Sequence, residues 1–164
     1  MHYINYYNSP IGKITMGSDG RSLIGLWFEN AKYFGSTLTS ETQEKDLPIF
    51  EETKNWLDIY FSGKNPDFTP KLKLEGSEFR MAVWNILKEI PYGQTITYGE
   101  IAKKIGTSKI SAQAVGGAVG HNPISIIIPC HRVLGKNGDL TGYAGGLNLK
   151  KQLLDNENRN AILH

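Results

Sequence analysis

The chain has 164 residues, of which 40% are apolar, and its formal net charge is +2. This length and composition are typical of a globular protein with one large domain or two small ones, and the single cysteine excludes an internal disulfide bond. No run approaches the roughly 20 apolar residues of a membrane span, and the first residues lack a signal-peptide pattern. We therefore expect a cytoplasmic protein without membrane association.

The charge is distributed unevenly along the chain. Residues 1–76 contain 8 Lys and Arg against 10 Asp and Glu, whereas residues 77–164 contain 10 against 6. A basic excess favours contact with a polyanion, so the second half is the part expected to lie near nucleic acid. The 4 histidines are scattered and no second thiol accompanies them, so neither a metal nor a cofactor is expected.

The first third of the chain has the pattern of a small β-meander followed by a helix. Short β-rich runs alternate with turn sequences, and a later segment has apolar residues at helical spacing. The predicted strands are residues 4–7, 12–17 and 23–28, and the predicted helix is residues 48–60. An extended segment over residues 65–74 leads to Gly76 and Ser77, where we place the boundary between domains 1–76 and 77–164.

The second half has the pattern of a helix-turn-helix protein. Ser77 is a suitable N-cap for a helix that Pro91 ends. Residues 98–105 then form a short helix, residues 106–108 a turn, and residues 110–120 a second helix. The chain is therefore expected to be an α+β protein.

The second helix of this pair contains almost no long side chain. Gly116 and Gly117 are adjacent within it, and each glycine costs roughly 1 kcal/mol relative to alanine in a helix interior. Either tight packing against another helix or close approach to a nucleic-acid groove explains such a sequence. The helix lacks the side chains that read bases in the major groove, which disfavours a sequence-specific regulator. Three nearby lysines are candidates for phosphate contacts, namely Lys103, Lys104 and Lys109.

The only cysteine stands in the sequence ISIIIPCHRV, residues 124–133. A cysteine after an apolar run is either a packing residue or a reactive thiol. We interpret the run as a buried strand that Pro129 ends, since proline cannot donate to a sheet. His131 and Arg132 would favour the thiolate, although neighbours in an extended chain face opposite ways, so His131 is not expected to touch the sulfur directly. The loop TGYAGG, residues 141–146, offers backbone N–H groups to a ligand.

Together with TGYAGG and the later KKQLLDNE, the sequence NPISIIIPCHRV resembles the O6-alkylguanine-DNA alkyltransferases, which repair DNA in a single turnover. The resemblance covers residues 76–157, and the motif PCHRV within it is specific. It implies an N-terminal RNase H-like domain, made of the β-meander and helix, and a C-terminal winged helix-turn-helix domain that carries the alkyl acceptor. The implied enzyme class is methylated-DNA--protein-cysteine S-methyltransferase.

The resemblance also implies roles for individual residues. Cys130 attacks the alkyl carbon and keeps the alkyl group as a thioether, while His131 acts as a base through a bound water and Glu157 orients it. Asn122 braces the loop around the site, and Tyr98 donates to the purine N3. The implied substrate-binding residues are Val133 (with the Cys130 carbonyl), Tyr143, Ala144 (through its N–H) and Lys150. Each has an ordinary structural explanation when taken alone, and their joint placement around one motif is what favours the catalytic interpretation.

In this family the alkylated nucleotide is flipped out of duplex DNA, at a cost of a few kcal/mol, and the second helix enters the minor groove. The resemblance implies O4-alkylthymine as a second lesion that the protein could flip out and repair. An arginine of that helix fills the gap in the family, but this chain has Gln113, a neutral and shorter side chain, at the matching position. Ala144 is a second departure, since some members have serine there. The implied DNA-binding residues are Gln113, Ser111, Ala112, Ala114, Gly117, Arg132 and Lys109.

Four functions remain in competition at this point. The favoured one is a stoichiometric alkyltransferase, a monomer that binds double-stranded DNA through the minor groove. The alternative is a non-catalytic sensor of alkylated DNA, but such sensors lack the acceptor that Cys130 provides. A winged-helix regulator with an oxidant-sensing cysteine would need a base-reading helix. A cysteine hydrolase would need a direct pair between Cys130 and His131.

Overall fold

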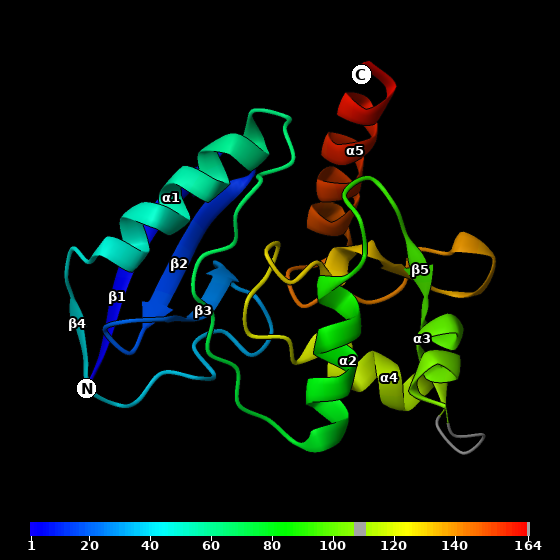
Figure 1. Cartoon of the computed structure of the whole chain (residues 1–164), viewed down its shortest axis with the longest axis horizontal. Coiled ribbons are helices and arrows are strands. Elements are labelled where there is room, and N and C mark those ends of the chain that lie inside the picture. The colour runs from blue at the N-terminus through cyan, green and yellow to red at the C-terminus, as the bar shows by residue number, and fades with distance from the viewer. Residues whose placement is uncertain (107–110, 164) are drawn as a thin grey trace.

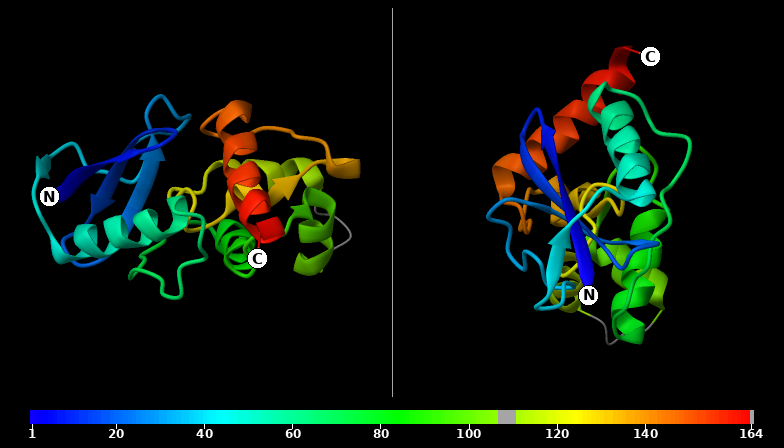
Figure 2. Two further views of the ribbon diagram at one scale, coloured as in Figure 1. Left: turned by 90° about the horizontal axis from the view of Figure 1, so that it is seen from above. Right: turned by 90° about the vertical axis from the view of Figure 1, so that its left-hand side faces the viewer.

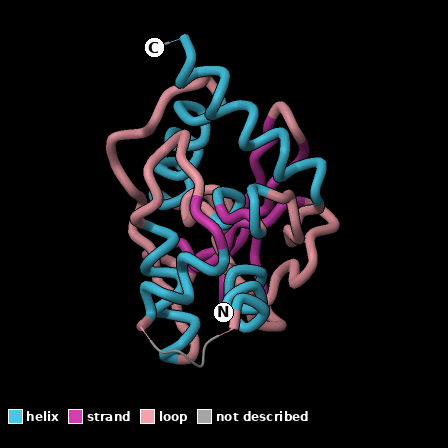
Figure 3. The backbone as a smooth tube through the Cα atoms, turned by 90° about the vertical axis from the view of Figure 1, so that its right-hand side faces the viewer, coloured by secondary structure: helices cyan, strands magenta, loops and turns pink. Residues whose placement is uncertain are grey.

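The computed structural model describes residues 1–106 and 111–163, and it shows two halves that lie side by side (Figures 1 and 2). The first half is a sheet covered by a helix, and the second is a group of helices with a small parallel strand pair. In Figure 3 the strands lie centrally with helices around them. No helix in the described part of the chain is both long and apolar enough to cross a membrane.

The sheet of the first half follows the predicted meander. Strands β1 and β2 pair antiparallel, as do β2 and β3, while β4 lies parallel to β1, so the order is β3-β2-β1-β4. Helix α1 lies along β1 and β2 (Figure 1) and has Pro48 in its first turn. The bounds are β1 His2–Ser9, β2 Gly12–Ser18, β3 Leu23–Phe28, β4 Thr42–Glu44 and α1 Pro48–Phe61.

Strand β3 is buried along its whole length, although it lies at the edge of this sheet. Its free backbone groups pair with two other segments. Leu23 forms a bridge with Leu72 in the connection between the halves, and Leu26 forms one with Ile124 in the second half. The backbone N–H of Leu26 donates to Pro123 at 2.8 Å, and that of Ser125 donates to Leu26 at 3.0 Å. The edge of the first sheet therefore joins the two halves.

The second half has the predicted helix-turn-helix order, and its helices begin at polar caps. Ser77, Thr97 and Ser111 each accept a backbone N–H of the first turn, and Thr97 forms a capping box with Glu100. Strands β5 and β6 pair parallel. The bounds are α2 Glu78–Lys88, β5 Ile96–Thr97, α3 Tyr98–Ile105, α4 Ala112–Gly120, η1 Cys130–Arg132, β6 Val133–Leu134, η2 Lys136–Gly138 and α5 Leu147–Leu163.

The mixed α+β class is confirmed, and most predicted elements are observed within a few residues of their expected bounds. The turn between α3 and α4 begins at Gly106, which has a positive φ of 86°. The rest of that predicted turn, together with Lys109 and the first residue of the predicted second helix, lies outside the described residues.

The prediction of a strand over residues 124–128 is wrong. Apart from the bridge at Ile124, this run is a series of tight turns, in which the Ile127 N–H donates to Ser125 and the Ile128 N–H to Ile124. Ile126 has a positive φ of 70°. Isoleucines occur in this run because their side chains pack into the core, and this packing does not require an extended backbone. Pro129 therefore ends no strand, and Cys130 begins the short 3-10 helix η1.

Candidate functional site

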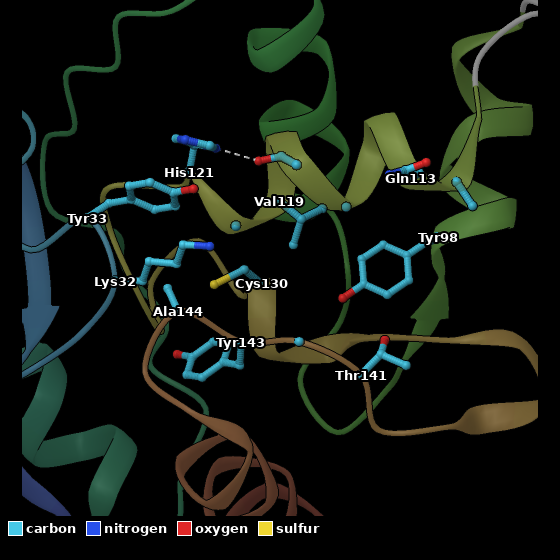
Figure 4. Close-up of a pocket in the computed structure, with 15 residues that line it drawn as sticks. Lys32, Tyr33, Tyr98, Gln113, Val119, His121, Cys130, Thr141, Tyr143 and Ala144 are labelled. Carbon is cyan, nitrogen blue, oxygen red and sulfur yellow. Dashed lines mark hydrogen bonds between the residues drawn. The ribbon is translucent and has the colours of Figure 1, made fainter.

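Cys130 lies at the wall of a cavity of about 450 Å³ (Figure 4). Helix α4 forms one side of the cavity and residues 141–144 form another, while Tyr98 at the start of α3 lies across from the sulfur. The thiol is 5% exposed. A cavity of this size, lined by aromatic and small residues with a few polar groups, is typical of a site for a base-sized ligand.

His131 and Glu157 form a buried pair directly behind the cysteine. Nε2 of His131 hydrogen-bonds Oε2 of Glu157, and the two side chains are 0% and 1% exposed. Glu157 lies on α5 and also accepts from the Tyr60 hydroxyl at 2.7 Å, from Nε of Arg132 at 2.7 Å and from the Gly93 N–H at 3.0 Å. Every partner of this carboxylate is a donor, so the site requires its ionised form.

The protonation of the pair follows from these contacts. Burial opposes ionisation of Glu157, but the hydrogen bonds from His131 and Arg132 and the positive charge of Arg132 outweigh it and lower the pKa of the carboxyl group to about 2. Burial lowers the pKa of His131, although the nearby carboxylate acts in the opposite direction. The lowered pKa favours the neutral ring. Since Nε2 must donate to Glu157, the neutral ring has its lone pair at Nδ1. That nitrogen has no hydrogen-bond partner among the described residues, so it is free to act as a base.

Burial raises the pKa of the Cys130 thiol. The nearby polar groups of Asn122 and Tyr143 and the charge of Lys150 act in the opposite direction without overcoming burial. The thiol is thus protonated at neutral pH and needs a base before it can act as a nucleophile.

Arg132 is paired with the same buried carboxylate as His131. Its side chain is buried, and it donates to Glu157 and, at 2.7 Å, to the carbonyl of Ile90. The contact of Arg132 with DNA stays a prediction, and in this structure its guanidinium neutralises the buried carboxylate of Glu157.

Asn122 and Lys150 hold the two loops that border the thiol. The Asn122 amide donates to the carbonyls of Ile124 and Ile128, at 3.2 and 2.8 Å, and accepts from the Ile124 N–H. Nζ of Lys150 donates to the Thr141 carbonyl at 2.7 Å and to that of Gly142 at 3.2 Å. Burial lowers the pKa of Lys150 to about 8. Both side chains shape the backbone around Cys130.

The remaining predicted substrate residues divide into two groups. Tyr98, Tyr143 and Ala144 line the cavity. Burial raises the pKa of Tyr98 and, well above the ordinary value, that of Tyr143. Val133 lies outside the cavity lining and is buried in β6 beside Ile96, with its N–H bound to the Cys130 carbonyl.

Helix α4 presents its small residues to the open side of the cavity. Val115 and Ala118 are buried and lie outside the cavity lining, whereas Val119, also buried, lines the cavity. A Cβ added at Gly117 would meet no atom within 4 Å, so helix packing does not explain that glycine. Five of the predicted DNA-binding residues lie on or at the start of this helix: Ser111 caps it, Ala114 is exposed, and Ala112, Gln113 and Gly117 line the cavity.

Two further cavity residues come from the first half of the chain and were not predicted. Lys32 and Tyr33 follow β3, and the Tyr33 ring stacks on that of His121 with 3.9 Å between centroids. The Lys32 N–H donates to the Ala144 carbonyl at 2.8 Å. Nothing in the local sequence distinguishes these residues from an ordinary surface turn.

Within the described part of the chain, no group of three or more His, Cys, Asp or Glu residues is arranged to hold a metal ion. Glu157, Asn122 and Lys150 are instead bound to donors or carbonyls of the protein itself. The arrangement is suited to nucleophilic attack by sulfur on a ligand held in the cavity, with a neutral histidine as the base.

Two protein-family models match the chain. Residues 78–159 match the DNA-binding domain of 6-O-methylguanine DNA methyltransferase, and residues 2–75 match its ribonuclease-like domain. Among curated proteins, the methylated-DNA--protein-cysteine methyltransferase of Methanosarcina acetivorans is 48% identical over 152 residues, which cover 93% of this chain and 96% of the relative. The protein of that name from Haemophilus influenzae is 46% identical over 156 residues, 94% of this chain and 86% of the relative.

Solved structures agree with these matches. The crystal structure of Mycobacterium tuberculosis OGT in complex with DNA has a TM-score of 0.86 at 41% identity, covering 96% of this chain and 94% of that one. The O6-methylguanine-DNA methyltransferase of Pyrococcus kodakaraensis has a TM-score of 0.63 at 29% identity, covering 96% and 99%.

Proposed function

The chain belongs to the 6-O-methylguanine DNA methyltransferase family and is a methylated-DNA--protein-cysteine methyltransferase of DNA alkyl-transfer repair; from this premise we propose that Cys130 takes the alkyl group from O6 of guanine. The observation that carries the proposal is the position of the only cysteine, at the wall of the cavity and beside the buried pair of His131 and Glu157.

The proposed reaction follows from the protonation states of the site. Nδ1 of His131 removes the thiol proton through a bridging water, and the Cys130 sulfur attacks the alkyl carbon. The new S–C bond forms as the C–O6 bond breaks, and the bonding pair stays on the guanine. Its negative charge is then neutralised by a proton from solvent, while protonated His131 returns its proton to solvent through the same water. Because the raised pKa makes Tyr98 a weak acid, it stabilises the leaving guanine by a hydrogen bond to N3. The thioether is stable, so each molecule reacts once.

The DNA is double-stranded in this proposal, and α4 enters its minor groove. An O6 atom inside a duplex is out of reach of a sulfur at the cavity wall, so the nucleotide must be flipped out. The open face of α4 at Gly117 supports this, because its backbone can approach DNA without a clash. Gln113 lies at the cavity lining and fills the gap in the stack. O4-alkylthymine is proposed as a second substrate, because its alkyl group can be transferred from oxygen to sulfur in the same way.

The same proposal includes the domain division at residues 76 and 77, a monomeric state and a location with access to the chromosome. The division is supported by the family models, which match residues 2–75 and 78–159 separately. A monomer suffices because the cavity and the face of α4 come from one chain. A non-catalytic sensor is the alternative, and the presence of Cys130 disfavours it.

Intact-protein mass spectrometry tests the proposal. After incubation with a short duplex that contains one O6-methylguanine, the protein is expected to gain the mass of one methylene group per molecule. Peptide mapping should place that mass at Cys130. Selective binding to the lesion without any mass gain would support the sensor, and a modification at another residue would exclude Cys130 as the acceptor.

Gln113→Ala is expected to slow repair of the duplex by about 10-fold, since unstacking a base step costs a few kcal/mol and the inserted side chain offsets part of that cost. The rate of inactivation by free O6-benzylguanine, which requires no flipping, serves as the matched control and should change much less. Single-turnover rates measure both reactions. Equal duplex rates for Gln113→Ala and the wild type would contradict the wedge role of Gln113.

A further inference from the structure

The cavity around Cys130 has a wall that comes from the first half of the chain. Lys32 and Tyr33 belong to residues 30–34, a turn segment that follows β3 and reaches the cavity beside the thiol (Figure 4). The second half alone therefore does not enclose the site.

This segment is held in place by contacts with both sides of the site. The Lys32 N–H donates to Ala144 in the loop over the cavity, and the Tyr33 ring stacks on His121 at an interplanar angle of 27°. Nδ1 of His121 in turn donates to the Gly117 carbonyl of α4 at 2.7 Å. Tyr33 has a φ of 65°, a left-handed conformation that is costly for a bulky residue and that surrounding contacts must maintain.

The wall lies at one end of the cavity. Figure 4 shows Tyr98 on one side of Cys130 and Lys32 with Tyr33 on the other. The orientation of the ligand in the cavity is taken from the proposed function, in which the purine N3 faces Tyr98 and the alkyl carbon faces the sulfur. Atoms of the adduct beyond the reacting carbon then point away from Tyr98, toward Lys32 and Tyr33.

The charge at this end is positive. Nζ of Lys32 lies over the Tyr33 ring, 5.3 Å from its centroid, and the side chain is exposed to the cavity mouth. No Asp or Glu is among the residues that line the cavity. The buried ammonium of Lys150 is already bound to two loop carbonyls. An anionic group in this part of the cavity would therefore meet Lys32 without competition from a carboxylate.

We propose that Lys32 makes the cavity selective for O6 adducts that end in a carboxylate, such as the carboxymethyl group, over neutral adducts of similar size. The transfer step is the same as for methyl: the sulfur forms a bond to the methylene carbon, the C–O6 bond breaks, and guanine leaves with the electron pair. Lys32 pairs with the carboxylate during the attack and takes no part in bond breaking, so it is a specificity residue.

The test compares three duplexes that contain O6-methylguanine, O6-carboxymethylguanine or O6-(2-hydroxyethyl)guanine. The last adduct is close to carboxymethyl in size but neutral. Second-order rate constants are measured from the mass gain of the wild type, Lys32→Met, Lys32→Glu and Lys32→Arg. We expect the ratio of the carboxymethyl rate to the hydroxyethyl rate to fall about fivefold in Lys32→Met and further in Lys32→Glu, while Lys32→Arg keeps it, because an exposed ion pair has a modest effect.

The outcomes separate this inference from the proposed function. An unchanged ratio in Lys32→Met and Lys32→Glu overturns the inference, whether or not the three rates fall together, since a lysine that binds only DNA phosphates affects all lesions equally. The methyl duplex serves as the control for the reaction itself. Absence of methyl transfer in the wild type would overturn the proposed function, and the inference with it.

Discussion

Cys130→Ser is expected to gain no mass from O6-methylguanine DNA while it still binds the lesion. Serine is close to cysteine in size, so the packed site is preserved, but a hydroxyl is a far weaker nucleophile than a thiolate at neutral pH. The neutral His131 is too weak a base to ionise it. We expect a loss of transfer of at least about 1,000-fold, or about 4 kcal/mol in the barrier.

Two control measurements separate loss of the reaction from loss of folding or of DNA binding. Thermal unfolding of Cys130→Ser beside the wild type shows whether the buried site remains folded, and a gel-shift titration with lesion and undamaged duplexes shows whether recognition is kept. A folded variant that binds the lesion and does not react identifies the sulfur as the acceptor. A variant that still gains the methylene mass would require another nucleophile and would remove Cys130 from the mechanism.

Glu157→Gln is expected to destabilise the protein by about 3 kcal/mol and to slow transfer by about 100-fold. The carboxylate accepts from four donors, among them His131 and Arg132, and an amide presents two donors of its own. Arg132 would then be buried without a counter-charge, which explains the loss of stability. Without the carboxylate, the protonated nitrogen of His131 is no longer fixed at Nε2, which explains the loss of rate.

The loss of stability in Glu157→Gln should depend on pH, and the pKa of Glu157 determines the direction of that dependence. The folded pKa is lowered from the ordinary 4.5 to about 2, so the ionised carboxylate stabilises the folded state above pH 4.5. That stabilisation is lost as the pH falls from 4.5 to about 2. The difference in unfolding free energy between wild type and Glu157→Gln should therefore shrink over this range. Urea denaturation at pH 7, 4.5 and 3 measures it.

Tyr60→Phe is the matched control for Glu157→Gln. It removes one hydrogen bond to the same carboxylate oxygen that binds His131, and it leaves every charge in place. Its cost should be near 1 kcal/mol and should vary less with pH than that of Glu157→Gln, because the buried charges remain. If the difference between wild type and Glu157→Gln stays constant from pH 7 to 3, the buried carboxylate does not stabilise the fold through its charge.

Local sequence signals predicted the structural elements that depend mainly on residues close together in the chain. Strand β3, the helix over residues 98–105 and the Ser77 cap were each expected from turn residues, apolar spacing or capping chemistry, and all three are observed. Local signals were wrong where an apolar run was taken as a strand, over residues 124–128. Burial of the isoleucines is compatible with tight turns as well, because the turn bonds and the Asn122 amide satisfy the backbone.

The sequence by itself determined the helix-turn-helix order and, through the motif PCHRV, the family, and it contains the single cysteine that we propose as the acceptor. Only the tertiary structure decided that Tyr60 and Arg132 also bind the carboxylate that the resemblance pairs with His131, although 97 and 25 residues of sequence separate them from Glu157. It also turned Arg132 inward and brought Lys32 to the cavity. The physical reason is that spacing along a chain reports the local backbone, whereas the partner of a buried charge is selected when distant segments pack and exclude water from it.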